Sequence, residues 1–472
     1  MEHKKRWWAL IILCFGILMI VLDTTIVNIA LPSIKSDLGF SDSSLVWVLN
    51  AYLLTFGGFL LLSGRLGDLF GHRKLFLIGI AIFTLASLAC GISQDQTTLV
   101  IARAVQGIGG AVVTAVALSL IINMFPEGPE RAKAMGVYSF VAAAGGSIGL
   151  LVGGFVTNMS DWHWNFLINI PVGIVVIVLA WMYVPSSRSL AASRHLDIWG
   201  AITVTSALLL AVYAIVGGNQ VGWMSTQTIG LLAGAVALLG IFIWIESRVR
   251  SPLMPLGLFK LRNVITANTM AILWAASMFA WFFLTALYLQ LILDYSPLYV
   301  GLAFLPANII MAAFSLGLSA RLVNRFGIKR PLSFGLFFAA VGFLYLSIAP
   351  VEGDYFVNVF PSLILLGLGA GMAMNPLLLA AMNDVPPDES GLASGLVNTS
   401  FMMGGALGLA ILASLAAART ASVLSTPGTD QLIALNSGYH AAFILGAIFA
   451  ISASVLGWGV IKVKKLDASH VS

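Results

Sequence analysis

Two ionisable side chains, Asp23 and Arg103, lie within long apolar stretches of this 472-residue sequence. Asp23 lies nine residues before Pro32, at the end of its apolar run, so we expect it roughly 13 Å inside a membrane. An ionised group at that depth is costly unless it is paired or hydrated. Burial favours the neutral acid, whereas a nearby cation favours the carboxylate. A carboxyl group under both influences can exchange a proton, and Arg103 is its natural partner.

Both residues also have purely structural interpretations. Asp23 could be a structural carboxylate that Arg103 and the hydroxyl groups of Thr24 or Thr25 satisfy. Arg103 could instead extend its long side chain to the membrane surface. Gln106 lies three residues after Arg103, on the same face of a helix, and is expected to line the same cavity.

The composition places these residues in a membrane. Hydrophobic residues make up 59% of the chain, charged residues only 9%, and the mean hydropathy is +0.99. Soluble domains are about 45–50% apolar and about 25% charged, which argues against a soluble enzyme or a nucleic-acid-binding protein. The apolar runs are long and continuous, unlike the alternating strands of a membrane β-barrel. We therefore predict an all-α membrane protein.

Fourteen apolar runs are long enough to span a membrane. They cover residues 7–31, 45–64, 75–93, 99–124, 134–157, 166–184, 198–217, 227–245, 264–293, 299–320, 332–349, 357–381, 392–418 and 439–461. Nearly all of the 24 Lys and Arg residues then fall in loops on one side, and only Lys35 and Arg419 fall on the other. The excess of basic residues in cytoplasmic loops predicts that both termini are cytoplasmic.

A repeated loop indicates two related halves. Residues 65–74 read RLGDLFGHRK and residues 321–330 read RLVNRFGIKR, and each follows the second helix of a six-helix block. We therefore predict an N-terminal six-helix half at 1–184, an inserted two-helix linker at 185–263 and a C-terminal six-helix half at 264–472. Chance similarity of two basic loops is the alternative.

Several motifs resemble the major facilitator superfamily, in its fourteen-helix drug:proton antiporter branch. The resemblance is carried, in order along the chain, by LDTTIVNIALP (22–32), GRLGDLFGHRK (64–74), RAVQGIGGA (103–111), GGSIGLLVGG (145–154), WHWNFLINIPVG (162–173) and GLASGLVNTSFMMGGALGLA (391–410). It implies two halves that rock around a central cavity, with Arg103 near the first helix.

The resemblance also suggests roles for two glycine-containing motifs. In the loop after the second helix, a gate latch would comprise Gly64, Asp68, Gly71 and Arg73, with Arg73 pairing across the interface between the halves. Basic residues that only set topology, with turn glycines, are the alternative. In the fifth helix, close packing is expected at Gly145, Gly149 and Gly153, because small residues at this spacing let helices approach.

Other candidate residues are less specific. The substrate cavity is predicted to include Asn28, Asn50, Tyr52, Gln106, Trp274 and Trp281. The two tryptophans belong to an aromatic run that would suit planar or cationic lipophiles, although aromatic residues that pack or face lipid are common. Asp294 is a candidate second ion site, and Glu246 ends the eighth span. Both are also explained as residues at the membrane boundary.

These features predict a proton-coupled antiporter that exports lipophilic drugs, including cationic ones, across a bacterial-type plasma membrane. One alternative is a proton-coupled exporter of an endogenous metabolite or lipid, and another is a passive channel or a membrane scaffold. The sequence has no GxxxxGK[ST] phosphate loop and no HExxH motif. We expect a monomer that uses no cofactor, metal or nucleic acid, and that is not an enzyme.

Overall fold

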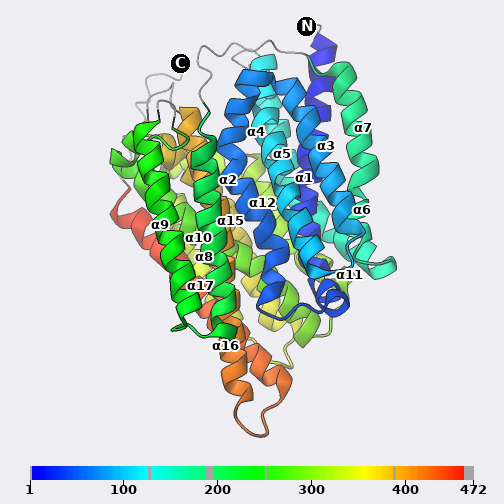
Figure 1. Cartoon of the computed structure of the whole chain (residues 1–472), viewed down its shortest axis with the longest axis vertical. Coiled ribbons are helices and arrows are strands. Elements are labelled where there is room, and N and C mark those ends of the chain that lie inside the picture. The colour runs from blue at the N-terminus through cyan, green and yellow to red at the C-terminus, as the bar shows by residue number, and fades with distance from the viewer. Residues whose placement is uncertain (1–2, 126–128, 186–195, 250–251, 386–389, 462–472) are drawn as a thin grey trace.

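The computed structural model describes residues 3–125, 129–185, 196–249, 252–385 and 390–461. These residues form a bundle of helices with no strand among them (Figure 1). Twelve of the helices described are long and apolar enough to cross a membrane. Two more lie over the remaining predicted spans. One is α5 (Pro129–Met159) and the other is α14 (Lys329–Leu346), an 18-residue helix that begins with two basic residues. A count of fourteen spans stays a prediction.

The first seven helices pack against one another. They are α1 (His3–Leu38), α2 (Trp47–Phe70), α3 (His72–Gly91), α4 (Gln96–Met124), α5, α6 (Trp164–Leu167) and α7 (Asn169–Tyr183), with a short 3-10 turn η1 (Ser44–Val46) before α2. Helix α4 packs on both α2 and α3, and α1 packs on α5 and α7. This arrangement brings the first, fourth and seventh helices to one place inside the bundle.

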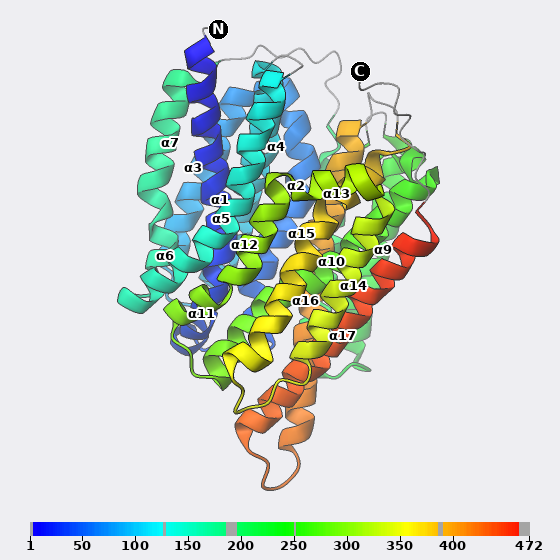
Figure 2. The same cartoon turned by 180° about the vertical axis from the view of Figure 1, so that it is seen from behind.

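The C-terminal helices form the second group. They are α10 (Arg262–Leu287), α11 (Pro297–Ala303), α12 (Leu305–Ala313), α13 (Ser319–Phe326), α14, α15 (Phe360–Met382), α16 (Ser390–Leu424) and α17 (Gln431–Gly459). Short π-helical segments lie at η3 (Tyr288–Ile292), η4 (Phe314–Leu318) and η5 (Tyr355–Val359), and a 3-10 segment η2 (Leu256–Lys260) precedes α10. Seen from behind, α11 and α12 run beside α5 (Figure 2).

The inserted pair is a hairpin of α8 (Ile198–Val221) and α9 (Thr226–Arg248). It lies on the outside of the bundle, where α8 packs against α2 and α16 (Figure 1). The division of the chain at residues 184 and 264 stays a prediction, although the hairpin bridges a helix from each of the two groups.

Several helix boundaries differ from those predicted. Helix α1 continues through Pro32 to Leu38, because a single proline removes only one backbone donor. The predicted span 166–184 is divided at Ile168 into α6 and α7. The predicted span 299–320 is divided into shorter segments, and Gly317 has a left-handed backbone conformation with φ of 129°. A glycine accepts that conformation without a steric cost.

Polar side chains at loop ends start several helices. Asp95 precedes α4, and its carboxylate accepts hydrogen bonds from the backbone nitrogen and the hydroxyl group of Thr98. These bonds hold the pKa of Asp95 below its usual range, and the bond from the hydroxyl group has the larger effect. Ser225 caps α9 and Asp430 caps α17 in the same way.

Candidate functional site: a buried charge network on α1, α4 and α7

Asp23 on α1 and Arg103 on α4 form a fully buried ion pair. Arg103 Nη1 lies 2.5 Å from Asp23 Oδ2, and the two residues are 0% and 1% exposed. Arg103 therefore does not extend to the membrane surface. The hydroxyl groups of Thr24 and Thr25 donate instead to backbone carbonyls of α1, so they do not satisfy Asp23.

Two amides complete the coordination of the Asp23 carboxylate. Gln106 Nε2 and Asn169 Nδ2 donate to Asp23 Oδ1 over 2.8 and 3.0 Å. Both amides also donate to the hydroxyl group of Ser87 on α3. The Gln106 carbonyl in turn accepts a hydrogen bond of 2.6 Å from Arg103 Nη1. The carboxylate thus has three side-chain donors, which reduce the cost of burying its charge.

Arg103 has further contacts on α2. Its Nε donates to the backbone carbonyl of Val48 over 3.0 Å. The guanidinium carbon lies 4.5 Å from the centre of the Tyr52 ring and 5.6 Å from that of Phe166, within range of a cation–π attraction. Its Nη2 donates to no acceptor among the side chains and backbone described. The network therefore retains one donor that is free to bind water or a ligand.

Close helix contacts at glycines hold the network in place. A Cβ atom on Gly107 would collide with the Tyr52 carbonyl and the Thr55 hydroxyl group on α2. A Cβ atom on Gly109 would lie 2.7 Å from the backbone nitrogen of Phe83 on α3. The glycines of the RAVQGIGGA motif therefore let α4 approach two helices, which brings Arg103 and Gln106 to their partners.

Asn169 is placed by the break between α6 and α7. The hydroxyl group of Ser87 donates to the carbonyl of Phe166 on α6 over 2.9 Å. The Trp162 indole donates to Asp37 near the end of α1. These two bonds hold α6 against α3 and α1, so the first residue of α7 points at Asp23. Sequence reasoning missed Asn169 and Ser87, although WHWNFLINIPVG contains the first of them.

The predicted packing glycines of α5 lie against α1. Cβ atoms added to Gly145 and Gly153 would lie 2.9 and 2.5 Å from side-chain carbons of Val21 and Ile26. A Cβ atom on Gly149 would collide with the hydroxyl group of Thr25. This face of α5 therefore supports the helix that carries Asp23.

The predicted cavity residues of the N-terminal helices are buried and only partly satisfied. The amide group of Asn50 is 0% exposed, and neither its oxygen nor its nitrogen has a hydrogen-bond partner in the described part of the chain. The Tyr52 hydroxyl group and Asn28 Oδ1 are also buried without a hydrogen-bond partner in the described residues. Asn28 Nδ2, by contrast, donates to the Thr24 carbonyl. Such atoms can bind water or a polar substrate group.

The two predicted tryptophans lie on α10 and belong to the other group of helices. Trp274 and Trp281 are fully buried, and neither indole nitrogen has a partner among the atoms described. Trp281 lies 4.4 Å from Phe282 and 6.1 Å from Phe304 between ring centres. They share no hydrogen bond or ring contact with the Asp23 network.

The predicted latch loop joins α2 to α3. Gly71 takes a backbone φ of 92° between the two helices, a conformation that favours glycine. Arg73 donates to the Trp181 carbonyl near the end of α7, within the N-terminal group of helices rather than across the two groups. A Cβ atom on Gly64 would meet nothing within 4 Å. The side chain of Asp68 lies outside those that the structure describes.

The two other acidic residues considered in the sequence, Asp294 and Glu246, differ in exposure. Asp294 is exposed in the turn after η3, and its φ of 55° is the left-handed conformation. Glu246 on α9 is only 3% exposed. Within the described residues, no three His, Cys, Asp or Glu side chains are grouped closely enough to hold a metal ion.

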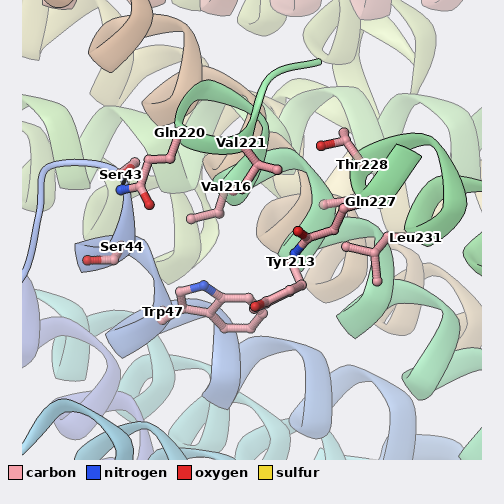
Figure 3. A pocket seen from close by; sticks show the side chains of 12 residues that line it. Ser43, Ser44, Trp47, Tyr213, Val216, Gln220, Val221, Gln227, Thr228 and Leu231 are labelled. Carbon is pink, nitrogen blue, oxygen red and sulfur yellow. Dashed lines mark hydrogen bonds between the residues drawn. The ribbon is translucent and has the colours of Figure 1, made fainter. Parts of the chain in front are cut away.

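A separate cavity of about 170 Å³ lies between the start of α2 and the inserted hairpin. Its wall combines the rings of Trp47 and Tyr213 with the polar side chains of Ser43, Gln220 and Thr228 (Figure 3). None of the predicted cavity residues lines it.

Comparisons with known proteins place this geometry in context. The sequence model described as Major Facilitator Superfamily matches residues 13–409. The chain is 38% identical to puromycin resistance protein pur8 of Streptomyces alboniger, over 97% of this chain and 92% of that protein. It is 36% identical to cephamycin export protein CmcT of Amycolatopsis lactamdurans, over 95% and 91% of the two chains.

A solved structure has the same fold. It is a bacterial homologue of the human lysosomal transporter Spinster, in an inward-facing and unoccupied conformation. The TM-score is 0.68 at 15% identity, with 97% of each chain covered.

Proposed function

Because this chain belongs to the major facilitator superfamily, and is a multi-pass transporter of a bacterial plasma membrane rather than an enzyme, we propose that it exports lipophilic drugs in exchange for protons. In this proposal it has fourteen spans, both termini are cytoplasmic, and cationic drugs are among the substrates. The observation that carries the proposal is the buried Asp23–Arg103 pair with its amide donors.

Asp23 has the properties that a coupling carboxyl group needs. As a carboxylate it is held by Arg103, Gln106 and Asn169, and as a neutral acid it would release some of these donors. Protonation would therefore rearrange contacts among α1, α4 and α7. A proton that changes the contacts between helices can shift a transporter between two states.

Contacts between the two groups of helices support alternating access. Gln290 Nε2 in η3 donates to the Ile29 carbonyl of α1 over 3.1 Å. A Cβ atom on Gly154 of α5 would lie 2.5 Å from the Pro297 carbonyl at the start of α11. In the predicted orientation these contacts close the extracellular side, and their opening would release the substrate outward.

The names of the relatives support drugs as the substrate class. One is named for puromycin resistance, another for cephamycin export, and a third is multidrug resistance protein Stp of Mycobacterium tuberculosis, 34% identical over 89% of this chain. The second relative is named for export rather than for resistance, and the alternative is that the natural cargo is an endogenous metabolite or lipid. Accumulation of a metabolite inside a deletion strain would favour that alternative.

The test is efflux of a panel of lipophilic compounds from vesicles that contain the purified protein, with and without a protonophore. We expect the protonophore to abolish concentrative efflux. Asp23→Asn should reduce efflux to the protonophore level while substrate still binds, because an amide cannot exchange a proton. Unchanged pH dependence in Asp23→Asn would exclude the coupling role, and flux that does not saturate would indicate a channel.

A further inference from the structure

Two carboxyl groups face each other in the inserted hairpin, far from Asp23 in the sequence. Asp197 precedes α8 and Glu246 lies near the end of α9. Their side chains are 2% and 3% exposed. Because α8 and α9 pack as an antiparallel hairpin, both carboxyl groups lie at the same end of it, where Asp197 acts on Glu246. If both carboxyl groups were ionised, they would repel each other strongly, because the protein interior screens charge poorly.

Each carboxyl group uses one oxygen and leaves the other unsatisfied. Asp197 Oδ1 accepts a hydrogen bond of 2.8 Å from Gly200 N, and Glu246 Oε2 accepts one of 3.2 Å from Met254 N. Asp197 Oδ2 and Glu246 Oε1 are buried and have no hydrogen-bond partner in the described ranges. A single hydrogen between these two acceptors would satisfy both.

In the described part of the chain, no positively charged side chain acts on Glu246. Asp197 is the charged side chain whose field acts on Glu246. Arg65 of α2 reaches the carbonyl of Pro252, and Arg248 and Lys260 are exposed. Arg194 and His195, just before Asp197, lie outside the described residues.

We propose that Asp197 and Glu246 form a second proton-binding site, in which one proton lies between Asp197 Oδ2 and Glu246 Oε1. The helix ends assign the two roles. Asp197 caps the N-terminus of α8, where the helix dipole favours an anion. Glu246 lies in the last turn of α9, where the dipole disfavours one, so Glu246 is the neutral acid. Its Oε1 donates to Asp197, and its carbonyl oxygen Oε2 accepts from Met254.

The site is linked to the loop that follows α2. Residues 252–254, which we call the strap, are held on one side by Glu246 at Met254 and on the other by Arg65 at Pro252, over 2.6 Å. Loss of the proton would make the two carboxylates repel each other and would strengthen the bond that Glu246 accepts from Met254, because an ionised carboxylate is the better acceptor. The protonation state of the hairpin therefore affects the position of the strap and its hydrogen bond with Arg65. Arg65 is the residue that begins the RLGDLFGHRK loop.

The experiment measures the unfolding temperature of the purified full chain across about pH 5 to 9, where carboxyl groups in such pairs titrate. A proton bound in the folded state stabilises at low pH, and this stability is lost as the pH rises. We expect the unfolding temperature of the wild type to fall with rising pH. Glu246→Gln and Asp197→Asn should flatten that fall, because an amide N–H replaces the shared hydrogen permanently.

Infrared spectra of the same samples give a second measurement. The wild type should show a protonated-carboxyl band that disappears at high pH and is absent from either amide variant. The control Asp95→Asn, at an exposed helix cap, should retain both the band and the fall in unfolding temperature, and so should Asp23→Asn. If the wild type and both amide variants have parallel curves and the same band, the shared proton does not exist. Neither measurement depends on transport, so the result is independent of the proposed function.

Discussion

At the scale of single residues, the Asp23 carboxylate is held by donors from two other helices. Arg103 and Gln106 come from α4 and Asn169 from α7, and the two amides share Ser87 as a further acceptor. Donors to a carboxylate stabilise its charged form. Each of these donors therefore supports the buried carboxylate, and each can be removed separately.

Asn169→Ala should slow proton-driven efflux, because the Asp23 carboxylate loses one of its three side-chain donors. A hydrogen bond to a charged group contributes about 1.5–3 kcal/mol, so the rate should fall by about tenfold or more. The measurement is the initial rate of drug efflux from vesicles at a fixed proton gradient.

Ser63→Ala is the control, since the buried Ser63 hydroxyl group donates to the Phe59 carbonyl within α2 and does not contact the network. Its efflux rate should stay close to that of the wild type. Equal losses in the two variants would show that general loosening of the helices, rather than the donor to Asp23, sets the rate.

Arg103→Lys should lower the rate of proton-driven efflux by more than about tenfold. The guanidinium binds Asp23, Gln106 and the Val48 carbonyl together, whereas an ammonium group cannot match this planar arrangement. Initial efflux rates at a fixed proton gradient measure the effect. A rate equal to that of the wild type would mean that only the positive charge at this position matters.

At the scale of elements, the glycine face of α5 decides where α1 lies. The structure leaves no space for a side chain between Gly149 and the backbone and hydroxyl group of α1 residues Leu22 and Thr25. The glycine spacing in the sequence indicated such a contact. It could not indicate which helix is the partner, because any small or flat helix face fits a glycine stripe.

Gly149→Ala should separate α5 from α1 and destabilise the fold by about 1–3 kcal/mol, the usual cost of overpacking. Gly146→Ala, on the same helix, is the control, because a Cβ atom there meets nothing within 4 Å. Thermal unfolding in detergent compares the two variants. If both lose the same stability, the cause is not contact with α1.

The elements themselves were largely predictable from the apolar runs. Helices lie over every predicted span, and twelve of those described meet the length and hydropathy needed to cross a membrane. The break between α6 and α7 was missed because the span 166–184 was predicted from hydropathy alone. Pro171 follows the break and disfavours a continuous helix there. The bonds of Phe166 and Trp162 hold the chain on the other side of the break, and hydropathy does not record them.

At the scale of the whole molecule, two groups of helices meet at α5 and α11. Gly154 approaches the backbone of Pro297 and Leu298, and Gly301 approaches the Leu150 carbonyl. If the halves rock during transport, this contact has to separate in each cycle.

Gly154→Leu should therefore reduce efflux. A Cβ atom at Gly154 would already lie 2.5 Å from the Pro297 carbonyl, so a larger side chain should keep the two groups of helices apart. Initial efflux rates from vesicles measure the effect. Gly136→Leu on the same helix is the control, because a Cβ atom there meets nothing within 4 Å. Efflux equal to that of the wild type in Gly154→Leu would contradict a contact that closes in each cycle.

By itself, the sequence determined the environment of the protein, its family and its most informative charge pair. With only 9% charged residues, Asp23 and Arg103 stand out within apolar runs, and the ordered motifs predicted a family that the match to residues 13–409 confirms. Only the tertiary structure showed that Asn169 and Ser87 complete the network, and that Asp197 and Glu246 face each other across a hairpin. The physical reason is that a charge within an apolar span is costly and rare, so the sequence alone is enough to single it out. The donors that satisfy it are common residues, and only packing decides which of them reach it.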